Sequence, residues 1–263
     1  MRAAVQHATN GDVRIAYEVH GTGEPLLLMH GLGYGRWGWE PLLEPLADDF
    51  RVLLYDNRGI GDSDVPPGPY TARQLADDAV AVLEAAGVER ADVVGTSLGG
   101  MAAQELALVF PDRVDRLVLA CTTPGGLSSY PMPQQTVDLM LAAAALPPEV
   151  ALRRFVENAL APGAPEGLVE RIYALRLSNR FDPKGWQAQA AAGVGFDALD
   201  RISEIQAPTL VVTGTADVVV DPRNSELLAG RIPQARLERV PGGHLFFWED
   251  PARFVTLVKE FLA

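Results

Sequence analysis

Hydrophobic and polar positions alternate early in the chain, and later give way to continuous apolar runs. Val13, Ile15, Tyr17 and Val19 alternate with polar or small residues, which predicts a half-buried strand. The later runs are almost entirely apolar, as is typical of strands covered on both faces. They span residues 25–29, 51–55, 91–94, 114–121 and 208–213, with a last short strand predicted at 235–240.

Helical patterns lie between these runs. A capping box, Thr71 to Gln74, precedes an apolar stripe at helical spacing that ends at Gly87. Further helices are predicted near 37–47, from Gly100 to Pro111, and after Asp250-Pro251. Strands that alternate with helices predict an α/β fold with a mostly parallel sheet flanked by helices.

The segment from about 124 to 207 breaks this alternation. It has no convincing strand pattern, is rich in Ala, Leu and Arg, and contains many prolines. We expect several short helices that form a cap inserted between two late strands of the sheet. The predicted division is a core of residues 1–123 and 208–263, and a helical cap of residues 124–207.

Composition narrows the possible partners and the compartment. The chain has 263 residues, of which 48% are hydrophobic, and this is enough for a sizeable core. Its net charge of −12 argues against binding to nucleic acid or to an anionic membrane. The first residues lack the apolar stretch of a signal peptide, and no run is long enough for a membrane helix. We therefore expect a cytoplasmic protein, with its single cysteine, Cys121, in the core.

The stretch Gly95-Thr96-Ser97-Leu98-Gly99 stands between a predicted strand and a predicted helix. This is the setting in which G-x-S-x-G forms a nucleophile elbow. Its glycines are expected where a strained turn brings the backbone close to neighbouring elements. Ser97 would lie at the start of the helix, where unpaired N–H groups favour negative charge. The simpler alternative is a glycine-rich turn whose serine only caps the helix.

A serine hydroxyl needs a base to become a nucleophile, and the chain has four histidines. His7 lies at the N-terminus and His20 before an early turn, both remote from the active end of any predicted strand, and His30 belongs to a loop with another use. His244 lies in a Gly-Gly-His loop after the last predicted strand. It is therefore the preferred base, with a surface-loop histidine as the alternative.

The base needs a carboxylate that holds its tautomer. Asp217 follows the strand run 208–213 and is the preferred partner. Asp221 is the nearest competitor, but Asp221-Pro222 is typical of the start of a helix. The predicted catalytic residues are thus Ser97, Asp217 and His244, in this chain order.

The oxyanion that develops during acyl transfer needs two hydrogen-bond donors. The backbone N–H of Leu98, at the head of the elbow helix, is one candidate. The other is the N–H of Leu32, in the loop after the strand that ends at Met29, because glycine at position 31 lets the backbone approach the substrate. We expect His30, Gly31 and Trp37 to lie at the substrate pocket.

Taken together, these motifs resemble those of the α/β-hydrolase fold family, in its serine-esterase, haloperoxidase-like and enol-lactonase-like branch. The His30-Gly31 loop, a D-x-R-G-x-G-x-S stretch at 56–63, the elbow, the G-x-x-D loop and the G-G-H loop stand in the family's order. The resemblance covers about 10–123 and 208–263, and it implies that loop 56–63 is structural. Serine at position 97 argues against haloalkane dehalogenases and epoxide hydrolases, which carry aspartate there.

One motif points to a different function. Residues 33–38 fit G-x-G-x-x-G after a strand, and Asp56 ends the next strand, as in a dinucleotide-binding fold. However, the glycines begin three residues beyond the strand, and Pro41 and Pro45 interrupt the helix that such a fold needs. We therefore expect no dinucleotide cofactor, and the sequence has no metal-site or nucleotide-site motif.

The sequence predicts a serine hydrolase that cleaves a small, fairly apolar carboxylic ester through an acyl-enzyme. A lactonase of the enol-lactonase type and a carbon–carbon bond hydrolase are alternatives with the same catalytic residues, because they differ mainly in the cap pocket. A small-ligand receptor built on the same fold is the alternative outside the enzymes. The expected partner is a small ester or lactone, and the oligomeric state is left open.

Overall fold

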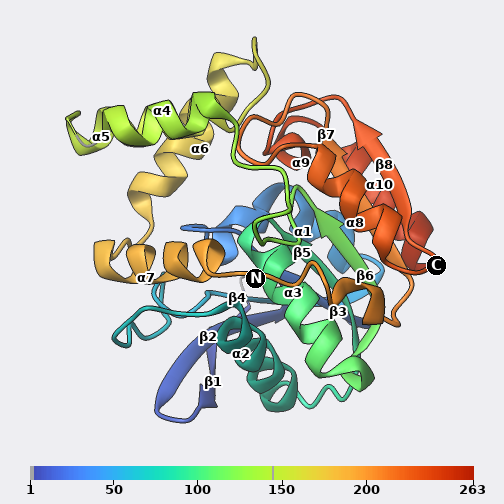
Figure 1. Cartoon of the computed structure of the whole chain (residues 1–263). Coiled ribbons are helices and arrows are strands. Elements are labelled where there is room, and N and C mark those ends of the chain that lie inside the picture. The colour runs from blue at the N-terminus through green and yellow to red at the C-terminus, as the bar shows by residue number, and fades with distance from the viewer. Residues whose placement is uncertain (1–2, 144) are drawn as a thin grey trace.

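A central sheet of eight strands organises the part of the chain that the computed structural model describes, residues 3–143 and 145–263 (Figure 1). The strand order is β1-β2-β4-β3-β5-β6-β7-β8. The first two strands run antiparallel to their neighbours, and the other six are parallel. The strands are β1 (Gln6–Asn10), β2 (Val13–His20), β3 (Glu24–Met29), β4 (Phe50–Tyr55), β5 (Ala91–Thr96), β6 (Val114–Ala120), β7 (Thr209–Gly214) and β8 (Arg236–Val240).

Sequence patterning predicts seven of these strands and misses β1. That strand pairs with β2 at the edge of the sheet, and only Ala8 in it is buried. Its backbone hydrogen bonds hold it in place while most of its side chains are exposed, so the strand carries no hydrophobic period. The α/β fold with a mostly parallel sheet is confirmed.

Helices cover both faces of the sheet and explain the continuous apolar runs. In β3, Leu27 and Met29 pack into the cluster beneath α2, α3 and α8, whereas Leu26 and Leu28 pack into the cluster beneath α1 and α10. All four side chains are fully buried. The core helices are α1 (Glu40–Ala47), α2 (Ala72–Ala85), α3 (Leu98–Val109), α8 (Arg223–Arg231), α9 (Phe246–Glu249) and α10 (Pro251–Leu262), with 3-10 turns η1 (Arg36–Trp39) and η2 (Pro111–Arg113).

Two predicted helix starts have the expected capping contacts. Thr71 and Gln74 form the reciprocal capping box, since each side chain accepts a hydrogen bond from the backbone N–H of the other. Asp250 accepts a hydrogen bond from the Arg253 backbone N–H at 3.0 Å, at the start of α10. These local contacts fix where α2 and α10 begin.

Helices fill the insertion between β6 and β7, where Figure 1 shows α4, α5 and α6 grouped together and α7 lying apart from them. Val156 and Ile172 from this segment join one core cluster, and Ala188 and Ala192 join the other. The cap therefore rests on both clusters. Its elements are α4 (Gln134–Ala143), α5 (Pro148–Asn158), α6 (Glu166–Ser178), α7 (Pro183–Val194) and η3 (Ile202–Glu204).

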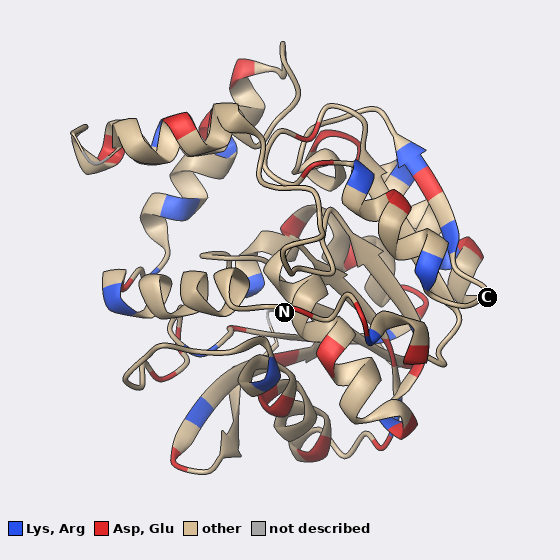
Figure 2. Ribbon diagram, in the orientation of Figure 1, with Lys and Arg blue, Asp and Glu red and all other residues tan. Residues whose placement is uncertain are grey.

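Charged residues are distributed over both parts of the molecule. Figure 2 shows acidic and basic segments interspersed on core and cap helices. Of the helices that the structure describes, none has both the length and the apolar character needed to cross a membrane.

Candidate active site

Ser97 lies in a strained turn between β5 and α3. Its backbone has φ 53° and ψ −120°, a conformation that is costly for a residue with a side chain. The flanking glycines make this turn possible. A Cβ on Gly95 would lie 2.6 Å from the Gly99 carbonyl oxygen, and a Cβ on Gly99 would collide with the carbonyl of Met29. The close approaches expected of the elbow glycines are therefore present.

Hydrogen bonds from the next strand hold the turn in this conformation. The backbone N–H of Ser97 donates to the Ala120 carbonyl at 3.0 Å. The Thr122 hydroxyl donates to the Ser97 carbonyl at 2.7 Å. The backbone on both sides of the serine is thus tied to the end of β6, which offsets the strain.

His244 and Asp217 form a buried pair. His244 Nδ1 lies 2.8 Å from Asp217 Oδ2, and the two residues are only 7% and 4% exposed. The other carboxylate oxygen accepts hydrogen bonds from the backbone N–H groups of Val219 and Val220, at 2.8 and 2.9 Å. With Nδ1–H donating to the fixed carboxylate, Nε2 of His244 is left with a lone pair.

Sheet register brings these residues to one edge. Thr96 of β5 pairs with Ala120 of β6, which in turn pairs with Val212 of β7. The carboxyl ends of parallel strands therefore coincide, and loops from β5, β7 and β8 meet there. A Cβ on Gly214 would collide with the backbone of the His244 loop, so glycine at this position lets the Asp217 and His244 loops meet.

Ser97 and His244 are not joined by a hydrogen bond in the described part of the chain. Catalytic hydrogen bonds are often long without substrate and tighten in the reacting complex. The structure thus brings together a strained serine and a buried His–Asp pair at the carboxyl end of the sheet.

The loop after β3 lies against the serine. A Cβ on Gly31 would stand 2.9 Å from Ser97 Cβ, so only glycine fits. The Gly31 N–H donates to His30 Nδ1 at 2.7 Å, so it already has an acceptor. The Leu32 and Leu98 backbone N–H groups make no hydrogen bond with any residue that the structure describes.

His30 lies behind this loop in an aromatic cluster. Its ring stacks on Tyr34 with 4.8 Å between centroids, and it also packs on Trp39 and Phe247. Burial lowers the pKa of His30 to about 3, so the ring is neutral at physiological pH. A role of His30 at the pocket would therefore run through the loop that it supports. Trp37 is half-buried and packs on Tyr34.

The glycines of the G-x-G-x-x-G stretch have packing roles. A Cβ on Gly35 would lie 2.5 Å from the Asp56 carboxylate, and one on Gly38 would lie 2.5 Å from His30 Nε2. These glycines let the loop wrap tightly around two buried side chains. Within residues 3–143 and 145–263, no cluster of three or more His, Cys, Asp or Glu side chains is suited to a metal ion.

The competing residues from the sequence lie elsewhere. Asp221 accepts a hydrogen bond from the Arg223 backbone N–H at 2.9 Å, and pairing with Arg223 lowers the pKa of Asp221. Helix α8 begins one residue later than expected, with Pro222 at its N-cap. His7 lies in edge strand β1, and His20 contacts Glu18 at 2.9 Å in β2.

Three supporting residues escaped the sequence analysis. Gln189 of α7 accepts from the Gly33 N–H at 3.2 Å. Glu249 accepts from the Gly243 N–H at 2.8 Å and ties the His244 loop to cap residue Ala161. Asn57, within loop 56–63, donates to the His30 carbonyl at 3.0 Å. No short motif marks Gln189 or Glu249, because their partners are distant in the chain or belong to the backbone.

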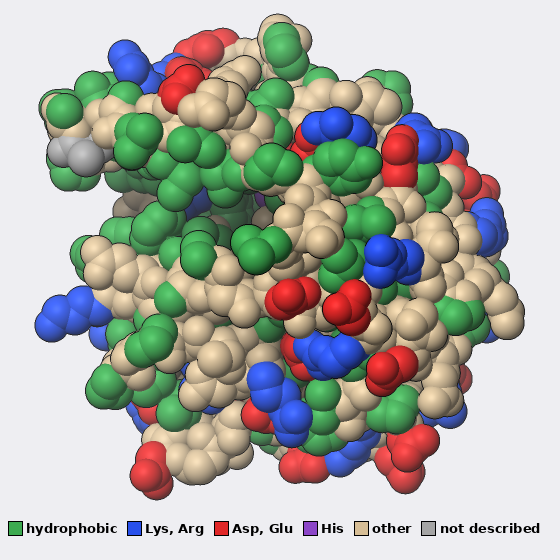
Figure 3. Space-filling view, viewed as in Figure 1, with side chains coloured by type: hydrophobic (Ala, Val, Ile, Leu, Met, Phe, Trp, Pro, Cys, Tyr) green, Lys and Arg blue, Asp and Glu red, His purple; other side chains and the backbone are tan. Residues whose placement is uncertain are grey.

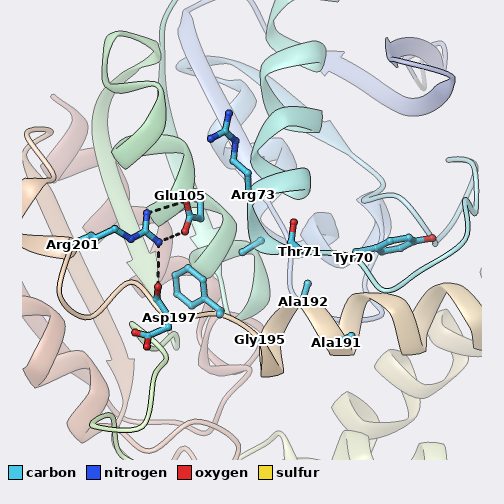
Figure 4. Close-up of a pocket in the computed structure, with 11 residues that line it drawn as sticks. Tyr70, Thr71, Arg73, Glu105, Ala191, Ala192, Gly195, Asp197 and Arg201 are labelled. Carbon is cyan, nitrogen blue, oxygen red and sulfur yellow. Dashed lines mark hydrogen bonds and ion pairs between the residues drawn. The ribbon is translucent and has the colours of Figure 1, made fainter.

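A cleft opens between the cap helices. Figure 3 shows it as a hollow between α4–α6 and α7, rimmed by hydrophobic side chains. A separate pocket of about 230 Å³ lies between α2, α3 and α7, where an ion pair of Arg201 with Glu105 forms one wall (Figure 4). The predicted catalytic residues do not line this second pocket.

Comparison with known proteins identifies the family. The model of a family described as alpha/beta hydrolase fold matches residues 24–251. The chain belongs to the α/β-hydrolase family. This match spans the core and the cap together, and it confirms the family resemblance seen in the motifs.

Proteins similar to this chain carry the names of different hydrolytic activities. The chain is 31% identical to 2-hydroxy-6-oxo-6-phenylhexa-2,4-dienoate hydrolase of Comamonas testosteroni, over 99% of this chain and 95% of that protein. It is similar to the enol-lactonase of Burkholderia xenovorans LB400, with 27% identity, TM-score 0.86 and coverage of 98% and 99%. It is also similar to a thermophilic esterase of Thermogutta terrifontis, with 29% identity, TM-score 0.83 and coverage of 100% and 98%.

Proposed function

We propose that this α/β-hydrolase cleaves carboxylic esters through an acyl-enzyme on Ser97. His244 Nε2 takes the proton of the serine hydroxyl as Oγ attacks the ester carbonyl, and then protonates the departing alcohol. Asp217 orients the imidazole and stabilises its cation. The observation that carries this proposal is the buried 2.8 Å contact between His244 and Asp217 at the sheet edge where the strained Ser97 turn lies.

The backbone N–H groups of Leu32 and Leu98 would stabilise the oxyanion. Leu98 is the first residue of α3, whose N-terminal end favours negative charge. Leu32 follows Gly31, which packs directly on Ser97. A water molecule activated by His244 then releases the acid, with the same two donors holding the second tetrahedral intermediate.

Three observations bear on the substrate. The cleft in Figure 3 is rimmed by hydrophobic side chains, which favours a substrate with an apolar body. The likeness to an enol-lactonase favours a cyclic ester as a second candidate, since lactone opening uses the same attack and the same oxyanion donors. The relative named as a dienoate hydrolase makes carbon–carbon cleavage a third reaction to assay.

The first test compares wild type with Ser97→Ala on p-nitrophenyl acetate, butyrate, hexanoate and octanoate. We expect the variant to lose at least about 10³-fold in kcat because the nucleophile is gone. Ser178→Ala is the matched control, since this exposed serine only bonds the Leu175 carbonyl at the end of α6. The acyl chain length with the highest kcat/KM measures the depth of the pocket.

A fluorophosphonate probe gives an independent readout, because it reacts with an activated serine whether or not the chosen esters fit. We expect one covalent adduct at Ser97 in wild type and none in the alanine variant. Equal ester rates in both proteins, or a folded wild type that neither turns over esters nor reacts with the probe, would contradict the proposal. Tight binding of a small ligand without turnover would then favour a receptor.

A further inference from the structure

A cation from the cap lies beside the loop that carries the proposed oxyanion donor. Arg176, on α6, holds its guanidinium carbon 4.6 Å from the centre of the Tyr34 ring. Its Nη2 atom lies 3.1 Å from the point that a Cβ on Gly33 would occupy. Gly33 directly follows Leu32, so the guanidinium reaches the border of the reaction site.

A second nitrogen approaches the same glycine from another cap helix. Nε1 of Trp186, on α7, lies 3.1 Å from the same Cβ position on Gly33. Gly33 has φ +73°, so both its backbone conformation and its surroundings exclude a side chain. Two N–H-bearing groups from α6 and α7 therefore converge over one glycine of the loop.

Among the described residues, neither group has a hydrogen-bond acceptor. Within residues 3–143 and 145–263, no acidic side chain lies in ion-pair distance of Arg176, and neither its guanidinium nor the Trp186 indole N–H donates a hydrogen bond. By contrast, Arg171 on the same helix pairs with Glu40 at 2.8 Å. Donors left without acceptors next to a reaction site are suited to an acceptor on the substrate.

The position of the guanidinium is set by the core. The Arg176 guanidinium lies over the Tyr34 ring, and Tyr34 in turn stacks on the buried His30 ring at an interplanar angle of 8°. Stacking fixes the plane of a guanidinium and leaves its edge free to bind a carboxylate with two parallel hydrogen bonds. The site is thus held in place before any substrate arrives.

The Gly33 position lies only a short distance along the loop from the nucleophile. A Cβ on Gly31 would stand 3.5 Å from Ser97 Oγ, and Gly33 is two residues further along the loop. Two residues span at most about 7 Å. An anion at Arg176 and the carbonyl that Ser97 attacks can therefore belong to one small substrate.

We propose that Arg176, with help from Trp186, selects substrates that carry a carboxylate at a distance from the scissile carbonyl. This inference rests on the proposed ester hydrolysis at Ser97. The net charge of −12 repels anions at long range, so any preference for an anion must come from a local cation. A substrate with an apolar middle and an acidic end matches both the cleft and this cation.

The test uses ester pairs that differ in one charge. Mono-p-nitrophenyl adipate and suberate are compared with their neutral methyl esters, which places the charge on the acyl side. 4-Carboxyphenyl butyrate and its methyl ester place the charge on the alcohol side. In at least one series, Arg176→Gln is expected to lower kcat/KM for the charged member by at least about tenfold, mainly through KM, and to leave the neutral member within about threefold.

Three further variants separate recognition from structure. Arg176→Lys keeps the charge without the planar fork, so it should retain part of the preference. Trp186→Phe removes the indole N–H and should lower the preference less than Arg176→Gln does. Arg154→Gln, an exposed site on α5, makes the same charge change and should leave all ratios unchanged. An equal loss on charged and neutral esters in Arg176→Gln would indicate only a structural contact and overturn the inference.

Binding provides an arm that does not depend on turnover. Hexanoate and hexanol are titrated against Ser97→Ala and against Ser97→Ala with Arg176→Gln, with tryptophan fluorescence as the readout. Hexanoate binding that weakens at least about tenfold without Arg176, beside unchanged hexanol binding, supports the anion site even if wild type cleaves no ester. Ser97-dependent hydrolysis with no charge preference in either ester series, and with hexanoate binding unchanged by Arg176→Gln, overturns the inference while the proposed function stands.

Discussion

The core and the cap differ in how far they bury their large apolar side chains. In the core, strands β3, β5 and β7 end in fully buried runs between two layers of helices. Among the described residues, every exposed large hydrophobic side chain except Val5 lies between 127 and 194, within the cap. Leu127 and Val194 are the most exposed of them.

This contrast separates two requirements on the sequence. The core must bury its apolar surface, so its pattern of residues is strict and its strands place Ser97, Asp217 and His244 at one edge. The cap contributes a few buried anchors, such as Val156 and Ile172, and leaves other apolar side chains outside the packed interior. We infer that the core determines the chemical step and that the cap determines which substrates reach it.

The largest expected effect comes from Asp217→Asn. Loss of the carboxylate removes the group that holds the His244 tautomer, so kcat should fall about 10³- to 10⁴-fold. The same factor is expected for every ester, whereas cap variants should change the ranking of esters. Rates across the p-nitrophenyl series test this, with Asp221→Asn as the control that stays within about threefold of wild type. A change in the ranking of the esters in Asp217→Asn would contradict the assignment of substrate choice to the cap alone.

The second largest effect should be a difference between core and cap in how much one leucine side chain contributes to stability. Leu119, near the carboxyl end of β6, is fully buried, and its replacement by alanine should lower the free energy of unfolding by about 2–5 kcal/mol. Leu141, on cap helix α4, is 73% exposed, so Leu141→Ala should change that free energy by less than about 0.5 kcal/mol. Urea denaturation of both variants measures the difference. Equal losses of free energy of unfolding in the two variants would mean that the Leu141 side chain is buried in solution.

Acidification should lower the free energy of unfolding through the protonation of His30 in the unfolded chain. Burial lowers its pKa in the folded protein to about 3 from the ordinary histidine value of 6.5, so the unfolded chain binds the extra proton as pH falls from 6.5 toward 3. Stability is then lost on acidification, by about 2 kcal/mol between pH 7 and pH 5. Asn at position 30 can still accept from Gly31 but cannot titrate.

The measurement for His30 is the free energy of unfolding in urea at pH 7 and pH 5, for wild type and His30→Asn. The difference in free energy of unfolding between wild type and His30→Asn should be about 2 kcal/mol less favourable to wild type at pH 5 than at pH 7. Burial raises the pKa of Asp92 to about 6 and acts in the opposite direction, but it is present in both proteins and cancels. His7→Asn, in exposed edge strand β1, is the control that should follow wild type. A constant difference between wild type and His30→Asn would refute the prediction.

The smallest expected effect comes from two glycines with open space around them. Gly167, in cap helix α6, has ordinary backbone angles, and Gly167→Ala should raise the free energy of unfolding by about 0.4–1 kcal/mol. Gly87 follows core helix α2 with φ +67°, so Gly87→Ala should lower it by about 1–2 kcal/mol. Thermal and urea unfolding measure both. The same sign in both variants would show that backbone conformation does not decide the outcome.

Local patterns carried much of the fold. The apolar runs gave the parallel strands, and the Thr71 and Asp250 caps marked the starts of α2 and α10. Edge strand β1 escaped because its pairing uses the backbone and its side chains are mostly exposed. The Gly33 to Gly38 motif begins three residues beyond its strand, and Gly35 and Gly38 within it pack against Asp56 and His30.

By itself, the sequence determined the family, the mostly parallel sheet and the candidate residues Ser97, Asp217 and His244, because each lies in a short motif beside a strand end. Only the tertiary structure decided which residues support them. Gln189 meets Gly33 from 156 positions away, and Arg176 and Trp186 converge on that same glycine from two cap helices. Such contacts depend on how the cap packs on the core, which leaves no periodic signal along the chain.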